Sequence, residues 1–245
     1  MRTLVGQIRL ETKLLFRDKR SLFLTLAFPV IMILIFGSVF SGQNWSGIPA
    51  INYLLPGMIV MALMMACMNN NAVKITNDRE KGIYRRLSLT PLRRQSLLTG
   101  HIFVRYLIVL ASTVLLIVIG VGVFGAQVGG NYFLFWFVLT VGALVFIALG
   151  FVLTSLVKNA NSAMTLAMAV LFPFMFLGGC FWPFDQIPLF LRPLCEALPA
   201  LHLNNALRLI VVQQAGFGVI SHGFPVMLAW LTGCSILAVK LFKWE

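Results

Sequence analysis

The most informative shortage in this 245-residue sequence is of charge. Charged residues make up 11% of the chain and hydrophobic residues 60%, whereas ordinary globular domains carry roughly 25% charged residues. No stretch is both long and polar enough to build a separate soluble domain. The net charge of +12 therefore does not indicate a soluble nucleic-acid binder, which needs a water-soluble fold on which to spread its cations. We expect one all-α integral membrane domain over residues 1–245.

Acidic residues are scarce, and none of the seven lies in the middle of a long apolar stretch. Proton- and ion-coupled carriers usually place ionisable groups within the membrane. The sequence also lacks an HExxH pair, carboxylates spaced for acid–base work and a GxxxxGK[ST] phosphate loop. We therefore expect neither an enzyme, nor an ion-driven carrier, nor a chain that binds ATP by itself. Energy for uphill transport would come from a partner.

Cysteine is also sparse, with four residues and no CxxC spacing or histidine partners. This pattern disfavours a metal site. Cys180 and Cys195 both fall near the predicted outer face, and the sequence leaves open whether they pair.

What the chain has in abundance is long apolar stretches. A spanning helix needs about 20 mostly apolar residues, and no alternation of period two suggests a membrane barrel instead. An even number of spans places both termini on one side. We predict six transmembrane helices, over residues 22–40, 53–73, 102–124, 132–157, 163–182 and 223–241.

The basic residues fix the orientation of these spans. Of the 19 Lys and Arg, all but Arg192 and Arg208 fall in stretches on one side of the predicted spans. Basic segments near the ends of spans stay in the cytoplasm. Both termini and residues 74–100 are therefore predicted to be cytoplasmic.

Two further segments are amphipathic without being long enough to span. Residues 1–21 place Leu4, Ile8 and Leu15 on one helical stripe and basic residues elsewhere, as in a helix that lies in the membrane interface. Residues 183–222, between the fifth and sixth spans, mix prolines, polar residues and leucines. We predict short re-entrant helices that dip into the outer leaflet there.

The cytoplasmic segment 74–100 has the features of a docking helix. Gly82 would end the helix that emerges from the second span, and Pro91 would end a short helix after it. Ile83, Tyr84 and Leu87 give that short helix an apolar face among basic residues, which suits a groove in another protein. The alternative is a basic loop that only contacts lipid headgroups.

Several motifs in this order resemble the ABC-2 family of ABC-transporter membrane subunits. Asp78-Arg79-Glu80-Lys81-Gly82, followed by Arg86-Leu87 and Pro91, is similar to the E-x-G…L…P signature of that family. The resemblance extends over nearly the whole chain, through Leu55-Pro56-Gly57, Leu177-Gly178-Gly179, Pro183, Pro188, Pro199 and Ala206-Leu207-Arg208.

The resemblance implies a permease of the bacterial cell (inner) membrane that pairs with two cytoplasmic ABC ATPase subunits. The ATPases would bind ATP and Mg²⁺, and this chain would bind no cofactor. The other implied partners are a second copy or a related permease, and membrane lipids, with no nucleic acid. The segment 1–21 would be an elbow or gate helix. The coupling positions would be Glu80, Gly82, Arg86, Leu87 and Pro91, with Tyr84 and Arg85 as neighbours.

The sequence constrains the cargo less. Aromatic residues crowd the outer end of the fifth span, either as an interfacial belt or as an exit for an amphipathic molecule. The second span carries methionines that give an adaptable surface, although such a stripe also suits a packed core. The predicted pathway residues are Met61, Met65, Phe172, Phe176 and Phe181.

We therefore expect the membrane subunit of an ATP-driven exporter of a lipophilic or amphipathic substrate, taken from the cytoplasm or the inner leaflet. Three alternatives stay open. They are an exporter of lipid-linked polysaccharide, an ATP-independent membrane facilitator and a lipid-modifying membrane enzyme.

Overall fold

The computed structural model describes residues 6, 12–13, 17, 19–45, 47–88, 94–181, 184 and 187–241. Side chains are not described for residues 19–22, 24, 85, 87–88 and 94–98. Apart from turns and irregular connections, the described part is helical except for an antiparallel hairpin of β1 (Asn44–Trp45) and β2 (Ile48–Pro49). Most of the predicted interfacial helix over residues 1–21 lies outside the described residues.

Long apolar helices build the molecule, at the positions where the sequence predicts spans. Five described stretches are long and apolar enough to cross a membrane: 50–80, 99–124, 132–156, 160–177 and 217–241. In the first long helix, the apolar stretch with described side chains is shorter, Thr25–Val39. The prediction of an all-α membrane protein is confirmed, and the count of six spans stays a prediction. The long helices are α2 (Lys19–Val39), α3 (Ala50–Met64), α6 (Arg94–Phe124), α7 (Tyr132–Leu156), α8 (Ala160–Leu177) and α12 (Phe224–Leu241).

The second predicted span continues well beyond its expected end at residue 73. α3 runs through a π-helical turn, η1 (Met65–Asn69), into α4 (Asn70–Glu80) without a break. Asn70 Nδ2 donates a hydrogen bond of 2.5 Å to Thr25 Oγ1 on α2. Polar side chains in this stretch lower the hydropathy but do not interrupt the helical hydrogen bonds, so the hydropathy underestimates the length of the helix.

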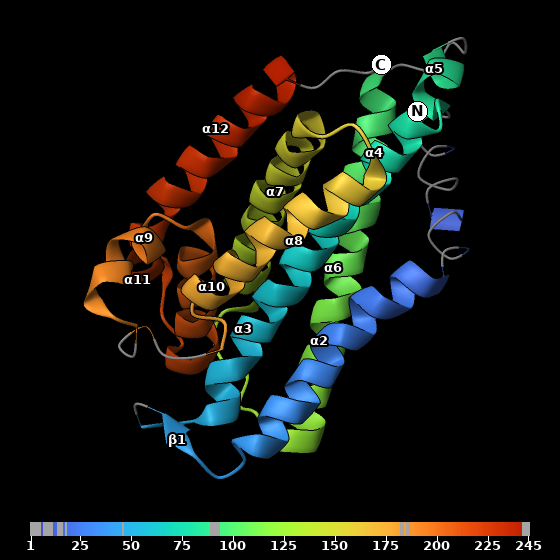
Figure 1. The fold of residues 1–245 in the computed structure, drawn as a ribbon. Coiled ribbons are helices and arrows are strands. Elements are labelled where there is room, and N and C mark those ends of the chain that lie inside the picture. Colours follow the sequence, from blue (N-terminus) through green and yellow to red (C-terminus); the bar gives the residue numbers. More distant parts are fainter. Residues whose placement is uncertain are drawn as a thin grey trace.

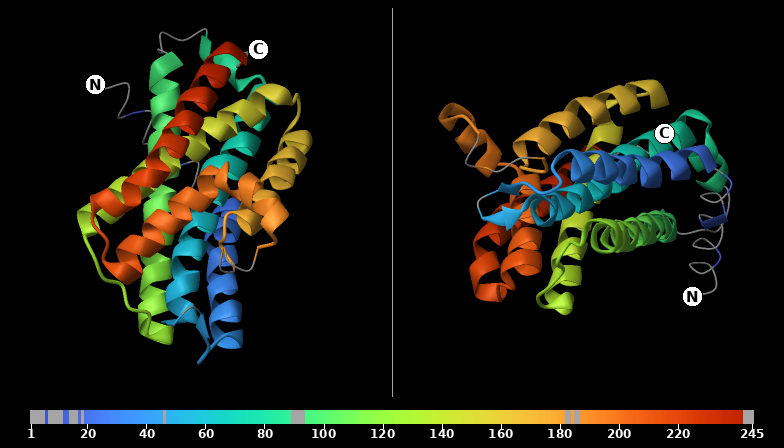
Figure 2. Two further views of the ribbon diagram at one scale, coloured as in Figure 1. Left: turned by 90° about the vertical axis from the view of Figure 1, so that its left-hand side faces the viewer. Right: turned by 90° about the horizontal axis from the view of Figure 1, so that it is seen from below.

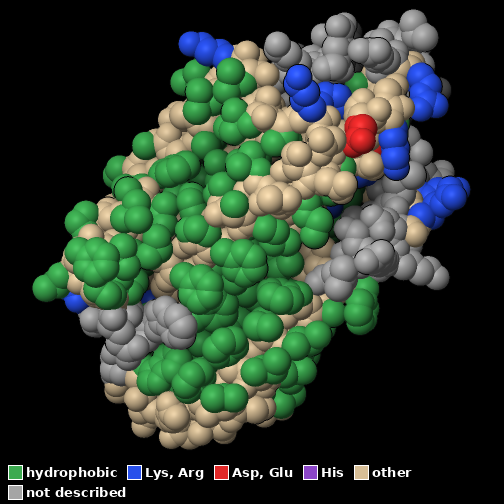
Figure 3. All heavy atoms as spheres, in the orientation of Figure 1, with side chains coloured by type: hydrophobic (Ala, Val, Ile, Leu, Met, Phe, Trp, Pro, Cys, Tyr) green, Lys and Arg blue, Asp and Glu red, His purple; other side chains and the backbone are tan. Residues whose placement is uncertain are grey.

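α3 is the central helix of the bundle (Figure 1). It packs against α2, α6, α7 and α10 (Pro199–Gln213), and nearly all of its side chains are buried. The outer helices present apolar side chains outward, and hydrophobic atoms cover much of the visible face in Figure 3. An apolar exterior of this kind suits contact with lipid rather than with water.

Short helices occupy the segment before α12, as the sequence predicts. α10 runs from Pro199 to Gln213 and packs against both α3 and α7, and Gln214, which caps it, adopts a left-handed conformation (φ 52°). Figures 1 and 2 show this group beside the long helices, with α10 lying against them. The other members are η3 (Leu189–Leu191), α9 (Arg192–Glu196), α11 (Phe217–Ile220) and η4 (Ser221–Gly223).

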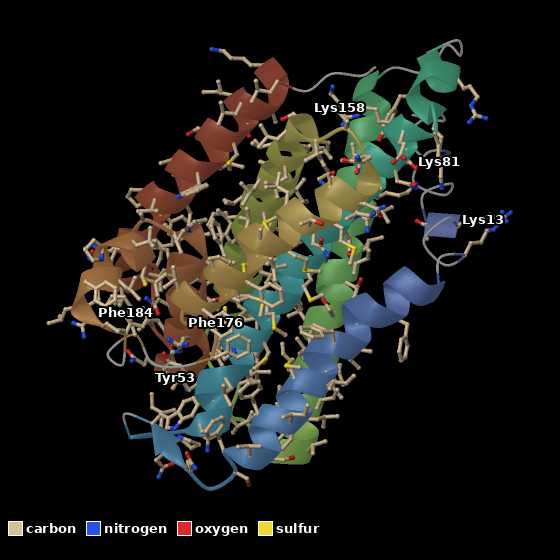
Figure 4. The ribbon with its side chains drawn as sticks, in the orientation of Figure 1. Lys13, Tyr53, Lys81, Lys158, Phe176 and Phe184 are labelled. Carbon is tan, nitrogen blue, oxygen red and sulfur yellow. The ribbon has the colours of Figure 1, made fainter. Side chains whose placement is uncertain are left out.

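The two ends of the bundle differ in chemistry. Figure 4 places Lys13, Lys81 and Lys158 toward the end that carries α5 (Ile83–Ser88), which we call the charged end. The opposite end, with β1 and β2, is the hairpin end, and Tyr53 lies toward it. The described basic residues are thus segregated in space as they are in the sequence.

All four cysteines are free and buried. Cys180 and Cys195, whose pairing the sequence leaves open, are therefore not joined. Burial raises the pKa of the Cys195 thiol, which makes it a weak nucleophile.

Candidate functional site

The turn between α4 and α5, residues 79–86, is the first candidate site. α4 is capped by Lys81, and Gly82 adopts a left-handed conformation with φ +65°. The Gly82 N–H donates to Arg79 O at 2.9 Å, and the Lys81 N–H donates to Asn77 O at 3.0 Å. Glycine follows a helix end in this way because it has no Cβ to clash in the left-handed region. The predicted helix break at Gly82 is confirmed.

Two side chains fix α5 against this helix end. Arg86 Nη2 donates to Lys81 O at 2.9 Å, placing a cation at the carbonyl end of α4, where the helix dipole favours it. Tyr84 is only 7% exposed and belongs to the main hydrophobic core. α5 is thus anchored by Tyr84 on one side, while the exposed Arg86 lies toward solvent. A partner pushing on α5 would therefore move α4 with it.

Residues 79 and 80 join the same turn to the connection between α7 and α8. Arg79 Nη2 donates to the backbone carbonyl of Val157. Glu80 Oε2 accepts a hydrogen bond of 3.0 Å from the N–H of Ala160, the first residue of α8. An acidic group at a helix N-terminus is favourable because of the unpaired N–H groups and the dipole there. The α4–α5 turn is therefore mechanically connected to α8 as well as to α3.

An ion pair stiffens α4 just before the turn. Lys74 Nζ lies 2.7 Å from Asp78 Oδ2 and 2.9 Å from Asp78 Oδ1, and the Asp78 side chain is only 7% exposed. Because a buried carboxylate without a partner is costly, the ion pair with Lys74 compensates for the burial of Asp78 at this position.

The structure brings together most of the predicted coupling positions. Glu80 contacts α8, Gly82 makes the turn, and Tyr84 and Arg86 hold α5 as described above. Arg85 and Leu87 lie on α5, but their side chains are not described, and Pro91 lies outside the described residues. The coupling role of all seven positions stays a prediction.

The second candidate site lies toward the hairpin end, where α3, α10 and the chain after α8 meet. Gly57 of α3 packs directly on the backbone of Cys180, such that a Cβ at position 57 would lie 2.8 Å from the carbonyl carbon and overlap its oxygen. Gly178 similarly faces Ala200 of α10: a Cβ added at position 178 would lie 2.8 Å from the Ala200 Cβ. Glycine is required at both points by close approach.

Two polar side chains of α10 join the same junction. Asn204 Nδ2 donates to Gly178 O at 3.1 Å and to Gly179 O at 2.6 Å. Arg208 Nη2 donates to Gly179 O at 3.1 Å, and its guanidinium lies 3.4 Å from the centroid of the Tyr53 ring. We call these contacts, with Gly57, the hairpin-end junction. This junction brings together three motifs that lie far apart in the sequence: Leu55-Pro56-Gly57, Leu177-Gly178-Gly179 and Ala206-Leu207-Arg208.

The predicted pathway residues do not share one environment. Met61 and Phe181 are buried inside the protein, and Met65 is half-buried beside the core. Phe172 and Phe176 on α8 are 48% and 44% exposed. The rings of Phe176 and Phe181 meet at a centroid distance of 5.5 Å. Whether these residues line a pathway stays a prediction.

The sequence gives no signal for several contacts of these sites. Tyr53 and Asn204 carry no motif of their own, and their partners lie more than twenty residues away. The Leu55-Pro56-Gly57 and Leu177-Gly178-Gly179 motifs were the only available hint that these segments matter. Among the described residues, no group of three or more His, Cys, Asp and Glu side chains is arranged to hold a metal ion.

Comparison with known proteins adds a family to this geometry. Residues 7–212 match the family described as ABC-2 type transporter. This match covers both candidate sites. The comparison with individual proteins agrees.

Three relatives illustrate the similarity. The chain is 27% identical over 223 residues to the daunorubicin resistance ABC transporter permease protein DrrB1 of Streptomyces coeruleorubidus, covering 88% of this chain and 77% of that protein. It is 20% identical over 204 residues to the probable multidrug ABC transporter permease YbhR of Escherichia coli (strain K12), covering 82% and 55%. It is 26% identical over 191 residues to ABC transporter G family member 20 of Dictyostelium discoideum, covering 77% and 26%. The chain thus spans about half of YbhR and about a quarter of the Dictyostelium protein.

Proposed function

Since the chain belongs to the ABC-2 type transporter family, we propose that it is the membrane subunit of an ATP-driven exporter. ATP hydrolysis would take place in separate cytoplasmic ATPase subunits, and a second copy or a related permease would complete the membrane part. The charged end would face the cytoplasm, with both termini there, and the group of short helices around α10 would dip into the outer leaflet. The segregation of the described basic residues supports this orientation.

The α4–α5 turn is the observation that carries the proposal. It presents a short helix at the charged end, anchored by Tyr84, with the exposed cation Arg86 beside it. Its two connections, along α4 into α3 and through Glu80 to α8, offer a route by which a movement of α5 reaches the membrane helices. A loop that only contacted headgroups would not need either connection.

A lipophilic or amphipathic cargo is the substrate class we favour. No described acidic residue lies in the middle of a long apolar helix, so a cationic cargo would have to rely on aromatic faces. The names of two relatives refer to multidrug and to daunorubicin resistance, which supports small hydrophobic molecules rather than lipid-linked polysaccharide.

The test is to reconstitute the chain, with the ABC ATPase that co-purifies in mild detergent, into liposomes. We expect ATP-dependent movement of hydrophobic compounds into the liposome lumen by complexes whose ATPase faces outward. We also expect these compounds to stimulate ATP hydrolysis. If only a glycolipid is transported and stimulates ATP hydrolysis, the substrate class is lipid-linked polysaccharide instead.

Two results would contradict the exporter itself. Transport by the purified chain without an ATPase and without ATP would indicate a facilitator. Chemical turnover of a lipid by the chain alone would indicate a membrane enzyme.

A further inference from the structure

A continuous row of aromatic rings crosses the hairpin end. Neighbouring ring centroids are 4.8–6.0 Å apart, within the range of favourable aromatic pairs. The row connects α8 and the chain after it to α2, then to the hairpin, then to α3. In order along the row, the rings are Phe176, Phe181, Phe36, Phe40, Trp45 and Tyr53.

Arg208 ends this row and attaches it to α10. Its guanidinium covers the face of Tyr53 at 3.4 Å, while Nη2 bonds to Gly179 O and Nη1 to Asn205 Oδ1 at 3.3 Å. A guanidinium suits this position because its flat face stacks on a ring while its edge donates hydrogen bonds. One side chain thus touches α3, α10 and the loop after α8.

The bonding of Arg208 is suited to being broken and remade. Each group that the structure describes as bonded to Arg208 is neutral: a ring, a carbonyl and an amide. These contacts are easier to break than a buried ion pair, because no acidic partner is left with an uncompensated charge when Arg208 moves away. Water entering the junction could solvate the guanidinium as it leaves Tyr53.

Tyr53 also lies on the helix that reaches the charged end. Residues 50–80 form one helical stretch through α3, η1 and α4, so Tyr53 and Glu80 are separated by about 40 Å along a single rod. A tilt or rotation of α4 at the α4–α5 turn would therefore displace the Tyr53 ring from under Arg208.

We propose that Arg208 is the latch of the outer gate: its contacts with Tyr53 and Gly179 hold the hairpin end closed, and displacement of α3 releases them. Arg208 is a positioning residue in this role, acting through the Tyr53 ring and the Gly179 carbonyl. The proposal rests on the proposed function, because a latch requires a gate that opens during transport.

Cys180 provides a native reporter of the latch. It is fully buried, follows Gly179 directly, and has Gly57 packed on its backbone. The test uses the full chain in cells, with Cys67, Cys195 and Cys234 replaced by alanine, and an impermeant maleimide added from outside. We expect Cys180 to stay unlabelled in this background and to react about tenfold faster or more in Arg208→Gln.

Two matched comparisons separate the latch from general damage. Tyr53→Leu removes the ring and should expose Cys180, whereas Tyr53→Phe keeps the ring and should leave it protected. Arg192→Gln removes the other outer arginine, which donates to Ile187 O and lies over the Phe184 ring, and should have no effect. If Arg208→Gln does not accumulate in the membrane, the difference in Cys180 labelling between Tyr53→Leu and Tyr53→Phe tests the proposal instead.

The second readout is the nucleotide state of the assembled complex. Trapping the ATPase with vanadate should increase Cys180 labelling in the parent, but should add little in Arg208→Gln, where the latch is already open. The proposal is overturned if Cys180 stays unreactive in both Arg208→Gln and Tyr53→Leu, or if Arg192→Gln exposes it equally. The variant comparison needs no ATPase and therefore tests the latch by itself. If the variants expose Cys180 as expected but labelling never depends on nucleotide, the exporter assignment fails instead.

Discussion

Gly82 allows the role of the α4–α5 turn to be tested by backbone strain alone. Its φ of +65° is left-handed, and a Cβ added there would meet nothing within 4 Å. Gly82→Ala therefore introduces no clash, only the cost of holding an L-residue in the left-handed region, roughly 1–2 kcal/mol. Gly82→Asn is the matched control, because asparagine tolerates this conformation better.

This strain acts on a turn held by few bonds. If the backbone relaxes toward a right-handed conformation, the Gly82 N–H bond to Arg79 O and the Arg86 bond to Lys81 O are lost or weakened. A penalty of about 1.4 kcal/mol shifts the ratio of ordered to disordered turn by about tenfold. The long helices do not depend on Gly82, so insertion and the amount of protein in the membrane should be unchanged.

The assay is transport per ATP hydrolysed by the complex reconstituted with its ATPase. We expect this ratio to fall several-fold in Gly82→Ala and to be largely retained in Gly82→Asn. If both variants transport as much substrate per ATP hydrolysed as the parent, the reasoning is refuted. The turn would then only contact lipid headgroups.

Three further predictions concern the Glu80 contact with α8, the hairpin-end junction and the orientation of the chain in the membrane. Glu80→Gln should change thermal stability little but lower drug-stimulated ATP hydrolysis, because the Ala160 N–H at the start of α8 loses its charged acceptor; unchanged stimulation would remove Glu80 from coupling. Gly57→Ala should lower the detergent melting temperature markedly, whereas Gly122→Ala, at a position where a Cβ meets nothing within 4 Å, should not; equal melting temperatures would show that the junction tolerates movement. A single cysteine at Ser88 should react only with reagents that reach the cytoplasm, and one at Gln127 with impermeant reagents from outside; the reverse pattern would invert the orientation.

The sequence predicts the long helices well because hydropathy and helix length are physically linked in a membrane. A spanning segment must be both apolar and internally hydrogen-bonded, so apolar stretches and helices nearly coincide. The prediction loses accuracy where a polar stretch stays helical or an apolar stretch leaves the helix. At Asn69–Asn71 the chain becomes polar, yet the helix continues through η1 to Glu80. At the other extreme, apolar residues continue to the predicted end of the fifth span at residue 182, but α8 ends at Leu177, before Gly179 with φ +66°.

The sequence predicts the α4–α5 turn better than it predicts the hairpin-end junction. The α4–α5 turn is local, so glycine chemistry and the motif around Glu80 predict its position from neighbouring residues. The hairpin-end junction depends on contacts between Tyr53, Gly179 and Arg208, which are far apart in the sequence. No local pattern indicates that a guanidinium will stack on a particular ring, since this follows from how α10 packs on α3. The β1–β2 hairpin likewise lies in a connection between two predicted spans, where hydropathy carries no signal for a pair of strands.

Cross-linking would show whether the α4–α5 turn contacts a separate ATPase. A photo-reactive group at Arg86 can be compared with one at Lys240, which lies in the last turn of α12. We expect an ATP-protectable or ATP-enhanced cross-link to the ATPase from position 86, and little from position 240. An assembled, active complex in which position 86 cross-links only to lipid would contradict this expectation.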